Sequence, residues 1–550
     1  MSQTKIKLLP YLVFCSGAAG MSLQLVGSRL LAPHFGNSIF VWTSLIGVML
    51  GFMALGNFLG GRLADQRTSP DLLFWILIFL SMSISLVAMI GAWTLGFFAE
   101  IESLRTGMVL AAASLFAIPC TLFGMVLPTS IRLRMMTVSD SGANIGGLSA
   151  ISMMGNIAGT FATGFWLIAF VGSRSLLAWL ALLVLLLALV VGLTLRRSAA
   201  GDWWHGGRSS VLTLQKLLAV GTALILIVGA FLWHPQARGM EDFRVFDTLY
   251  DKYLVGETTV VRGDGEPRPV QFLANNPRAM ESAVYADTLE PFFFEYYAFY
   301  DMAAQMASQS AGSYEPFHAL MIGGGAYVYP RFFFQQFPDS AMDVVEIDPA
   351  LLDESQENFG LLNHDFNMEV YHEDGRMFLN RTVRAGVREV AHKEGPPTAI
   401  YSRKSLYDLV ILDAFNSANN VPFQLTTHES MQHCADLLGD KGVLVMNMIA
   451  SAEGDGSQFL ASQYKTLREV FAQVEIYLVR PGAVQAGVPR NVAIIATNNE
   501  SFDLRHKAAS IDSVLAGQRF DPTSLLEHPR AMVLIDDFAP VDQMLLAVNR

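Results

Sequence analysis

The residues best suited to chemistry are glycines and carboxylates that follow apolar, strand-like runs in the C-terminal half of the chain. One such run ends in three successive glycines, Gly323, Gly324 and Gly325, and the next ends in Glu346. Glycines in a turn after a strand let a ligand approach the backbone closely, although an ordinary strand-to-helix turn can also contain them. A carboxylate about 20 residues beyond such a turn can accept hydrogen bonds from ribose hydroxyls. The pair therefore predicts a nucleoside site.

Two further carboxylates follow later apolar runs of the same kind. Asp374 comes shortly after the run Met368–Tyr371, and Asp413 directly follows the run Tyr407–Leu412. Either carboxylate could instead cap a helix or be a solvated loop charge. Because ligands of open α/β sheets bind at the carboxyl ends of the strands, all these side chains would line one crevice.

The elements that must position these residues alternate between strands and helices from about residue 317. The expected strands are His318–Ile322, Asp343–Ile347, Met368–Tyr371, Tyr407–Leu412, Gly442–Met448, Val474–Val479 and Asn491–Ala496. A helix is expected over Tyr327–Phe337, and a small β-rich lead-in over Phe243–Val261 and Pro269–Ala274, separated by turn signals from Gly263 to Pro267. Apolar strands alternating with helices predict a mostly parallel, Rossmann-like α/β sheet covered on both faces.

Composition divides the chain into two parts. Of 550 residues, 52% are hydrophobic and 16% are charged; the first 235 hold 13 basic and 6 acidic residues, and the remainder holds 24 basic and 43 acidic. This asymmetry excludes a uniform soluble globule, a disordered chain and a basic nucleic-acid binder. With three cysteines, no disulfide framework or paired-cysteine metal site is expected, and no metal is assigned.

The first part contains seven segments that meet or approach the roughly 20 apolar residues needed to cross a bilayer. The segments are Leu8–Ser28, Ile39–Gly61, Leu72–Phe98, Thr106–Ile131, Ser141–Ser173, Leu176–Leu195 and Leu217–Trp233. The first is too long for the core of a cleaved signal peptide, so an uncleaved helix is expected. The sequence thus predicts a multi-pass helical membrane domain.

Small residues and charges refine this prediction. Three glycine pairs with four-residue spacing, Gly47/Gly51, Gly56/Gly60 and Gly155/Gly159, predict close helix packing. The span interiors lack charged residues, which weakens a transport function, and Arg29 at a span edge is interpreted as an interfacial anchor or loop clamp. Loop charges place the N-terminus in the cytoplasm, so seven crossings would place the C-terminal domain outside. One miscounted helix reverses this, and the side stays open.

Taken together, the motifs resemble the spermidine synthase family, a branch of the class I S-adenosylmethionine-binding fold. More closely, the chain resembles bacterial membrane-fused spermidine-synthase-like proteins. The soluble resemblance covers roughly Phe243–Asn498, and the membrane resemblance rests on Arg29–Gly36 and on an expected loop at Gly60–Asp65. It implies a membrane domain over 1–235, a β-rich part over 236–290 and a nucleoside-binding catalytic domain over 291–550.

The resemblance also implies roles for individual residues. The three glycines would pass beneath the nucleoside and its sulfonium side chain. Glu346 would bind the ribose, Asp374 would hold the adenine amino group, and Asp413 would be the base near the reacting carbon. Tyr297, or its neighbour Tyr296, would be the active-site tyrosine.

Departures from the family pattern concern the second substrate. Ala326 stands where the family has an acidic residue after the glycines, and Asn416 stands where it has a second Asp. Leu273–Ser282 only loosely matches the family's Leu-Asp-Gly…Gln segment, with Glu281 in place of the Gln. These losses predict weak recognition of putrescine, whereas nucleoside binding is retained.

The resemblance implies a membrane-bound transferase that uses S-adenosylmethionine or its decarboxylated form and releases 5′-methylthioadenosine. Its partners would be a polyamine acceptor and the lipid bilayer, its location the bacterial inner membrane, and a homodimer is one candidate assembly. One alternative is self-cleavage of S-adenosylmethionine to methylthioadenosine and homoserine lactone. Another is a transporter or sensor with a non-catalytic nucleoside domain. An ordinary methyltransferase is less favoured.

Overall fold

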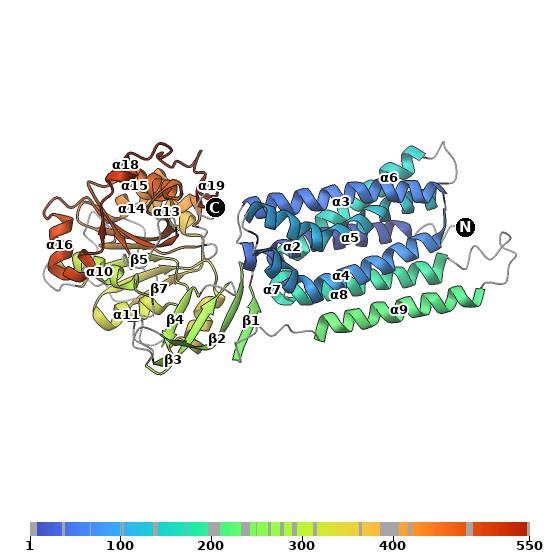
Figure 1. The fold of residues 1–550 in the computed structure, drawn as a ribbon, viewed down its shortest axis with the longest axis horizontal. Coiled ribbons are helices and arrows are strands. Elements are labelled where there is room, and N and C mark those ends of the chain that lie inside the picture. The colour runs from blue at the N-terminus through green and yellow to red at the C-terminus, as the bar shows by residue number, and fades with distance from the viewer. Residues whose placement is uncertain are drawn as a thin grey trace. The chain divides into compact units, whose positions relative to one another are not determined.

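In the computed structural model the chain forms two compact units, one helical and one α/β (Figure 1). The helical unit comprises Met1–Arg238 with Phe246–Lys252, and the α/β unit comprises Gly239–Val245 with Tyr253–Arg550. The structure describes residues 8–35, 39–66, 68–99, 101, 104–135, 141–171, 173–195, 209–232, 242–248, 250–261, 266–275, 280–288, 294–311, 316–361, 366–385, 406–415, 421–479 and 488–546. Gly263 to Gly265, Gly36 and Asn416, used in the predictions above, lie outside these residues.

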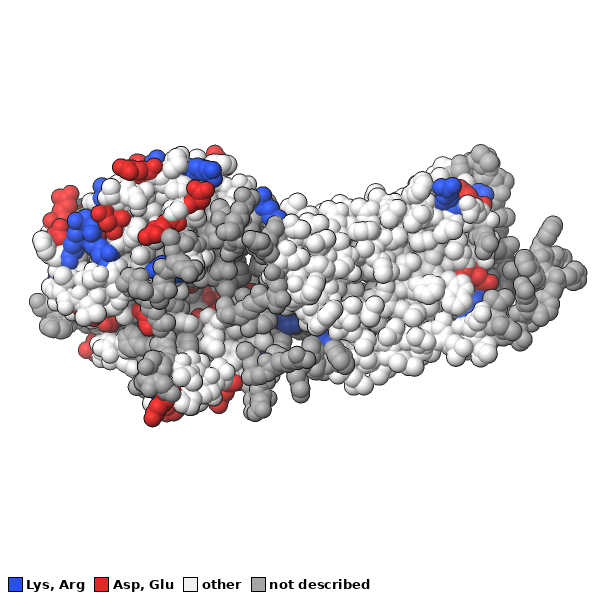
Figure 2. All heavy atoms as spheres, in the orientation of Figure 1, with Lys and Arg blue, Asp and Glu red and all other residues white. Residues whose placement is uncertain are grey.

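The described residues include seven helices long and apolar enough to cross a membrane, which confirms the predicted number. Their bounds are α2 Leu9–Phe35, α3 Ile39–Gln66, α4 Pro70–Phe98, α5 Leu104–Arg134, α6 Ser141–Ala162, α8 Ser173–Val190 and α9 Ser209–Leu232. α6 continues through a π-helical turn, Thr163–Leu167, into α7, Ile168–Val171, and α8 ends in a second π-helical turn, Val191–Leu195. In Figure 2 the visible face of this unit is almost free of charged side chains, except toward the helix ends.

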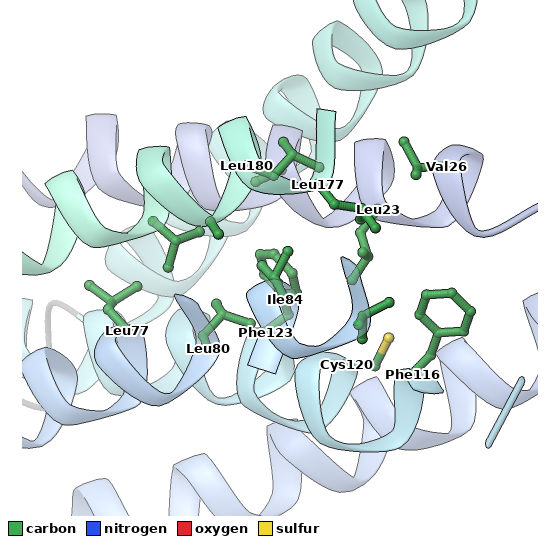
Figure 3. Close-up of a cluster of buried hydrophobic side chains, with 14 of the residues drawn as sticks. Leu23, Val26, Leu77, Leu80, Ile84, Phe116, Cys120, Phe123, Leu177 and Leu180 are labelled. Atoms are coloured by element: carbon green, nitrogen blue, oxygen red, sulfur yellow. The ribbon is translucent and has the colours of Figure 1, made fainter. Parts of the chain in front are cut away.

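The helices meet through a continuous apolar core. Figure 3 shows part of it, and Leu23 of α2, Ile84 of α4, Phe116 of α5 and Leu177 of α8 all belong to this cluster. All four side chains are buried. Packing of this kind, with small residues at the closest contacts, holds helices together where water supplies no driving force.

Two of the three predicted glycine pairs lie at such contacts. A Cβ atom added to Gly56 of α3 would lie 2.0 Å from the carbonyl oxygen of Thr121 in α5. One added to Gly155 of α6 would lie 2.1 Å from that of Phe14 in α2, and Gly60 and Gly159 are similarly crowded. The prediction for Gly47/Gly51 is wrong, because nothing among the described residues lies within 4 Å of an added Cβ there. Spacing alone cannot tell which helix face meets a neighbour.

We therefore expect Gly56→Leu to separate α3 from α5 and to lower the thermal stability of the full chain in detergent by several degrees. The matched control is Gly51→Leu in the same helix, which adds the same side chain on an open face and should leave the midpoint nearly unchanged. Equal midpoints for the two variants would show that the α3–α5 contact is not made as described.

Two predicted helix boundaries are wrong. α2 continues past Ser28 to Phe35, so Arg29 lies within the helix and not in a loop. The motif from Gly60 to Asp65 likewise lies inside α3, and Asp65 pairs with Arg132 at the end of α5, 3.2 Å away. Both stretches contain strong helix formers, and a helix that continues satisfies its own backbone groups where water is scarce.

The α/β unit begins with a four-stranded sheet in the order β1-β2-β3-β4. Its strands are β1 Asp242–Asp247, β2 Lys252–Val261, β3 Pro267–Ala274 and β4 Ser282–Tyr285. The β-rich lead-in is thus confirmed, and β4 is an addition. Antiparallel pairing of β3 with β4 matches Leu273 to Ser282.

The second sheet has eight strands in the order β12-β10-β11-β9-β8-β5-β6-β7. Its strands are β5 His318–Ile322, β6 Ala341–Val345, β7 Met368–Tyr371, β8 Leu409–Leu412, β9 Val443–Ala450, β10 Gln473–Leu478, β11 Arg490–Thr497 and β12 Arg519–Phe520. The block β9-β8-β5-β6-β7 is parallel, whereas β10 and β11 pair antiparallel at the other end. The mostly parallel sheet is confirmed. The strand β12 was not predicted, because two residues carry no periodicity.

Helices connect and follow these strands. They are α10 Tyr297–Ala311, α11 Val328–Gln336, α12 Ala350–Asn358, α13 Gly375–Ala385, α14 His428–Leu438, α15 Gln458–Val470, α16 Leu504–Ile511, α17 Ser513–Ala516, α18 Thr523–Leu526 and α19 Val541–Leu546, with short 3-10 turns at Phe423–Leu425 and Asp455–Ser457. Every residue of β8 is buried, as expected for a central parallel strand. This strand carries Asp413 at its carboxyl end.

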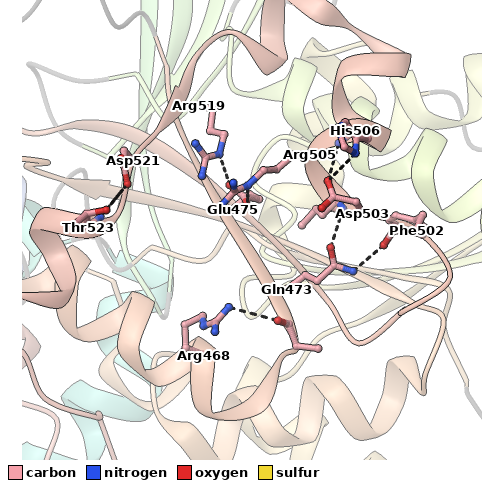
Figure 4. A network of polar contacts seen from close by, with 12 residues as sticks. Arg468, Gln473, Glu475, Phe502, Asp503, Arg505, His506, Arg519, Asp521 and Thr523 are labelled. Atoms are coloured by element: carbon pink, nitrogen blue, oxygen red, sulfur yellow. Dashed lines mark hydrogen bonds and ion pairs between the residues drawn. The ribbon is translucent and has the colours of Figure 1, made fainter.

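Glu475 holds the antiparallel end of the sheet together (Figure 4). The Glu475 side chain, on β10, is 8% exposed, and its two oxygens accept hydrogen bonds from Arg505 of α16 and Arg519 of β12, each at 2.5 Å. Because ionised partners strengthen a hydrogen bond, this carboxylate ties two late elements of the chain to the sheet.

Replacement of Glu475 by Leu should lower the free energy of unfolding by about 1–3 kcal/mol, because both arginines lose their acceptor. The measurement is a denaturant or thermal unfolding curve of the full chain, with the exposed Glu500→Gln as control. A stability equal to that of the control would mean that the two ion pairs contribute nothing net.

Candidate active site

The glycine turn joins β5 to α11 and brings the ends of β5 and β8 together. Gly323 has φ +96°, a conformation that L side chains rarely adopt. A Cβ atom there would lie 2.3 Å from the carbonyl oxygen of Asp413. The N–H of Asp413 in turn donates to the carbonyl of Ile322 at 2.9 Å. The glycine is therefore required by the approach of two strand ends.

Glu346 follows β6 and clamps the glycine turn. Its Oε2 accepts hydrogen bonds from the N–H groups of Gly324 at 2.8 Å and Gly325 at 3.1 Å, and its Oε1 accepts one from Asp348 at 3.0 Å. Burial raises the pKa of this carboxyl group, and the three backbone donors oppose part of the rise. A carboxylate has about four acceptor positions, and the described residues supply hydrogen bonds to three of them. Ribose binding by Glu346 stays a prediction.

Asp413 is a partly buried carboxylate at the end of β8. Its Oδ1 accepts a hydrogen bond from the side-chain amide of Asn447 on β9 at 2.9 Å. Burial raises the pKa of Asp413 to about 6, although Asn447 and the nearby Tyr300 hydroxyl oppose part of the rise. A group with a pKa near the working pH is suited to accept a proton during a reaction. The geometry thus makes Asp413 a candidate general base.

Aromatic rings surround this carboxylate. The ring centroids of Tyr297 and Tyr300 lie 5.7 Å apart, and the Tyr329 ring meets that of Tyr300 edge-on at 5.1 Å. Burial raises the pKa of Tyr297 and of Tyr296, and the charge of Asp413 raises both further. Both tyrosines suggested by the resemblance therefore lie near Asp413. The Tyr300 hydroxyl, also buried, makes no hydrogen bond of ordinary geometry among the described residues.

Ser282 connects the small sheet to this site. From the start of β4, its Oγ accepts a hydrogen bond from the N–H of Ala326 at 3.1 Å. Hydrogen bonding with the same serine lowers the pKa of Tyr297 against the effect of burial. A single serine thus links the glycine turn to the tyrosine cluster. Serines of this kind cannot be recognised from one sequence.

Asp374 follows β7 and serves as a helix cap. Its Oδ1 accepts a hydrogen bond from the N–H of Met377 at 3.0 Å, in the first turn of α13. The capping interpretation considered for this residue therefore applies, and its contact with adenine stays a prediction. β7 is the neighbour of β6, so Asp374 and Glu346 lie at the same edge of the sheet.

The structure adds residues that the sequence did not indicate. Tyr300, Ser282, Asn447 and Asn491 all contribute to the surroundings of Asp413, and none belongs to a motif with recognisable spacing. Glu281, which precedes Ser282, acts on the tyrosine cluster by raising the pKa of Tyr296. Among the described residues, no group of three or more His, Cys, Asp or Glu side chains could hold a metal ion.

Comparison with known proteins gives sequence relatives that match part of this chain. The polyamine aminopropyltransferase of Vibrio vulnificus is 24% identical over 243 residues, 42% of this chain and 71% of that protein. A probable polyamine aminopropyl transferase of Bifidobacterium longum is 27% identical over 161 residues, 29% of each protein. The eEF1A lysine and N-terminal methyltransferase of Bos taurus is 26% identical over 151 residues, 26% of this chain and 19% of that protein.

Two further comparisons concern models of protein families and solved structures. No model of a protein family matches the chain. A solved structure of a probable spermidine synthase from Corynebacterium glutamicum superposes on 55% of this chain and 97% of its own length, with 19% identity and a TM-score of 0.41. Through these sequence relatives the chain is similar to polyamine aminopropyltransferases and is in that sense spermidine-synthase-like, and its described residues combine an α/β unit with seven long apolar helices.

Proposed function

We propose that the protein is a membrane-bound transferase that moves the aminopropyl chain of decarboxylated S-adenosylmethionine, or the aminocarboxypropyl chain of S-adenosylmethionine, to an amine acceptor and releases 5′-methylthioadenosine. The observation that supports this most is the placement of Asp413. It is a partly buried carboxylate with a pKa of about 6, beside a glycine turn and a cluster of tyrosines. The aminopropyltransferase relatives support the transfer of an aminopropyl group rather than of a methyl group.

The chemistry requires one proton transfer. The amine nitrogen attacks the chain carbon bonded to sulfur, the carbon–sulfur bond breaks, and its electron pair remains on sulfur. The sulfonium thereby becomes the neutral thioether of methylthioadenosine. The attacking nitrogen, once bonded to carbon, must lose a proton, and a carboxylate within about 3 Å can accept it. Asp413 takes this role in the proposal.

The remaining residues would hold the donor. The turn from Gly323 to Gly325 would pass beneath the nucleoside, Glu346 would accept hydrogen bonds from the ribose, and Asp374 would contact the adenine amino group. Tyr297 would orient the chain that reacts, since its ring and hydroxyl lie near Asp413. We place residues 236–290 and 291–550 in one synthase-like region, and residues 1–235 in the bilayer of a bacterial inner membrane.

The test uses the purified full chain in detergent with S-adenosylmethionine or its decarboxylated form, with and without putrescine. Products are followed by mass spectrometry. Methylthioadenosine that forms only with an amine supports transfer. Formation without an amine would replace transfer by self-cleavage. A donor that is bound but never consumed would favour a sensor.

The rate should depend on pH through Asp413. The carboxylate is the basic form, so kcat/KM should rise between about pH 5 and pH 7, with a midpoint near 6, and then level off. Initial rates across this range, with saturating amine at each pH, measure the midpoint. A midpoint near 4, the ordinary value for an exposed aspartate, would remove Asp413 from the mechanism.

A further inference from the structure

Two asparagines on neighbouring strands form a chain of hydrogen bonds that ends on Asp413. The amide nitrogen of Asn491, on β11, donates to Oδ1 of Asn447 at 3.1 Å. The amide nitrogen of Asn447, on β9, donates to Oδ1 of Asp413 at 2.9 Å. Asn447 is 3% exposed. Both bonds run in the same direction, from β11 through β9 to β8.

The direction of this chain has a chemical consequence. A side-chain amide presents its oxygen on one side and its NH₂ group on the other. Because the oxygen of Asn447 accepts from Asn491, its NH₂ group faces Asp413. A donor that faces Oδ1 requires that this oxygen carry no proton. Only Oδ2 is then free to take one.

We propose that Asn447 and Asn491 are positioning residues that keep Oδ1 of Asp413 as a hydrogen-bond acceptor and make Oδ2 the oxygen that accepts the proton from the amine. This inference rests on the proposed function, because it assigns the oxygen used in the same transfer. In the step, the N–H bond of the attacking amine breaks and an O–H bond forms at Oδ2. The hydrogen bond to Oδ1 restricts the rotation of the Asp413 carboxylate. It thereby fixes the direction from which the amine must approach Oδ2.

The other groups near Asp413 cannot take over the role of this chain of hydrogen bonds. From the segment that begins α10, the side chains of Tyr296, Tyr297 and Tyr300 face it, and burial raises the pKa of each. Glu281 acts on Tyr296. Tyrosine hydroxyls rotate and can either donate or accept, so they do not specify one oxygen. The amide of Asn447 does, because its other end is held by Asn491.

The test compares Asn447→Leu, Asn491→Leu and the double variant in the full chain. Two quantities are measured against pH: kcat/KM for methylthioadenosine release, and the affinity for S-adenosylmethionine by calorimetry. Loss of the donor to a carboxylate raises its pKa, so Asn447→Leu should move both midpoints upward by about 1 pH unit. Asn491→Leu should move them by about half as much, because Asn447 keeps its amide but loses its anchor.

The double variant is the decisive member of the set. In the inference, Asn491 acts only through Asn447. Adding Asn491→Leu to Asn447→Leu should therefore cause no further shift of either pH midpoint. Asn498→Leu is the control: Asn498 follows the same strand, β11, and its oxygen accepts from the N–H of Ala472. That variant should leave both midpoints within about 0.2 units of the original protein.

Two results would overturn the inference while the proposed function stands. One is an unchanged midpoint in Asn447→Leu with measurable turnover. The other is a shift of the pH midpoint by Asn491→Leu that is equally large in the original protein and in the Asn447→Leu variant. If the original protein neither binds nor consumes any donor, the proposed function is wrong, and the inference about Asn447 and Asn491 is then wrong as well.

Discussion

Asp413→Asn should reduce methylthioadenosine release by about 10²- to 10⁴-fold, the usual contribution of a positioned general base. Asparagine keeps the shape of the side chain and can still accept the hydrogen bond from Asn447, but it cannot take up a proton. Donor affinity should therefore change by less than about tenfold. The measurement is a pair of titrations, one of rate and one of binding, with the exposed Asp339→Asn as control. An unchanged rate would exclude Asp413 as the base.

The same variant should be more stable than the original protein at high pH. The pKa of Asp413 in the folded state, about 6, is raised from 3.8, so the protonated form is favoured on folding. Its stabilisation is complete below about pH 4 and is lost as the pH rises through about 6. The uncharged asparagine side chain does not titrate, so the advantage of the variant should reach about 1–3 kcal/mol at pH 8 and vanish near pH 4. Thermal unfolding at both pH values measures this difference.

Gly323→Ala should cost about 3 kcal/mol or more and abolish nucleoside binding. The added Cβ would lie 2.3 Å from the carbonyl oxygen of Asp413, so the ends of β5 and β8 would have to move apart. The backbone at φ +96° is also strained for any residue but glycine.

Gly454→Ala is the matched control for backbone strain. Gly454 has φ +67°, and nothing among the described residues lies within 4 Å of an added Cβ. Gly454 has ψ −165°, a backbone region that residues other than glycine rarely adopt, so this variant should lose about 1–3 kcal/mol from strain alone. If both variants lost the same stability in unfolding experiments, the contact between Gly323 and Asp413 would not be the cause.

Periodicity and turn signals were sufficient for most of the fold. Long uncharged runs predicted seven helices, and the ends of β5 and β7 match the predicted runs to the residue. The packing of the helices against one another was harder to predict from the sequence. Gly47/Gly51 and Gly56/Gly60 have the same spacing in α3, yet among the described residues only the second pair faces another helix. Which face of a helix packs depends on where the other helices lie. The spacing of residues within one helix carries no information about that.

The site was predictable where a residue follows directly from a strand end. Glu346 and Asp413 lie beside the glycine turn because neighbouring parallel strands bring their carboxyl ends to one edge. Asn447 could not be found in this way. It lies within β9, 34 residues from Asp413 along the chain, and its role depends on strand order and on which way its amide faces. Such partners are determined by tertiary packing.

The most direct measurement follows a carbon-13 label in the S-methyl group of S-adenosylmethionine or of its decarboxylated form. In transfer of the three-carbon chain, the methyl group stays on sulfur. The account therefore predicts labelled 5′-methylthioadenosine, formed in equal amount with an unlabelled amine product and at a rate about 10²- to 10⁴-fold lower with Asp413→Asn. Unlabelled S-adenosylhomocysteine or its decarboxylated counterpart, together with a labelled acceptor, would show methyl transfer and contradict the account.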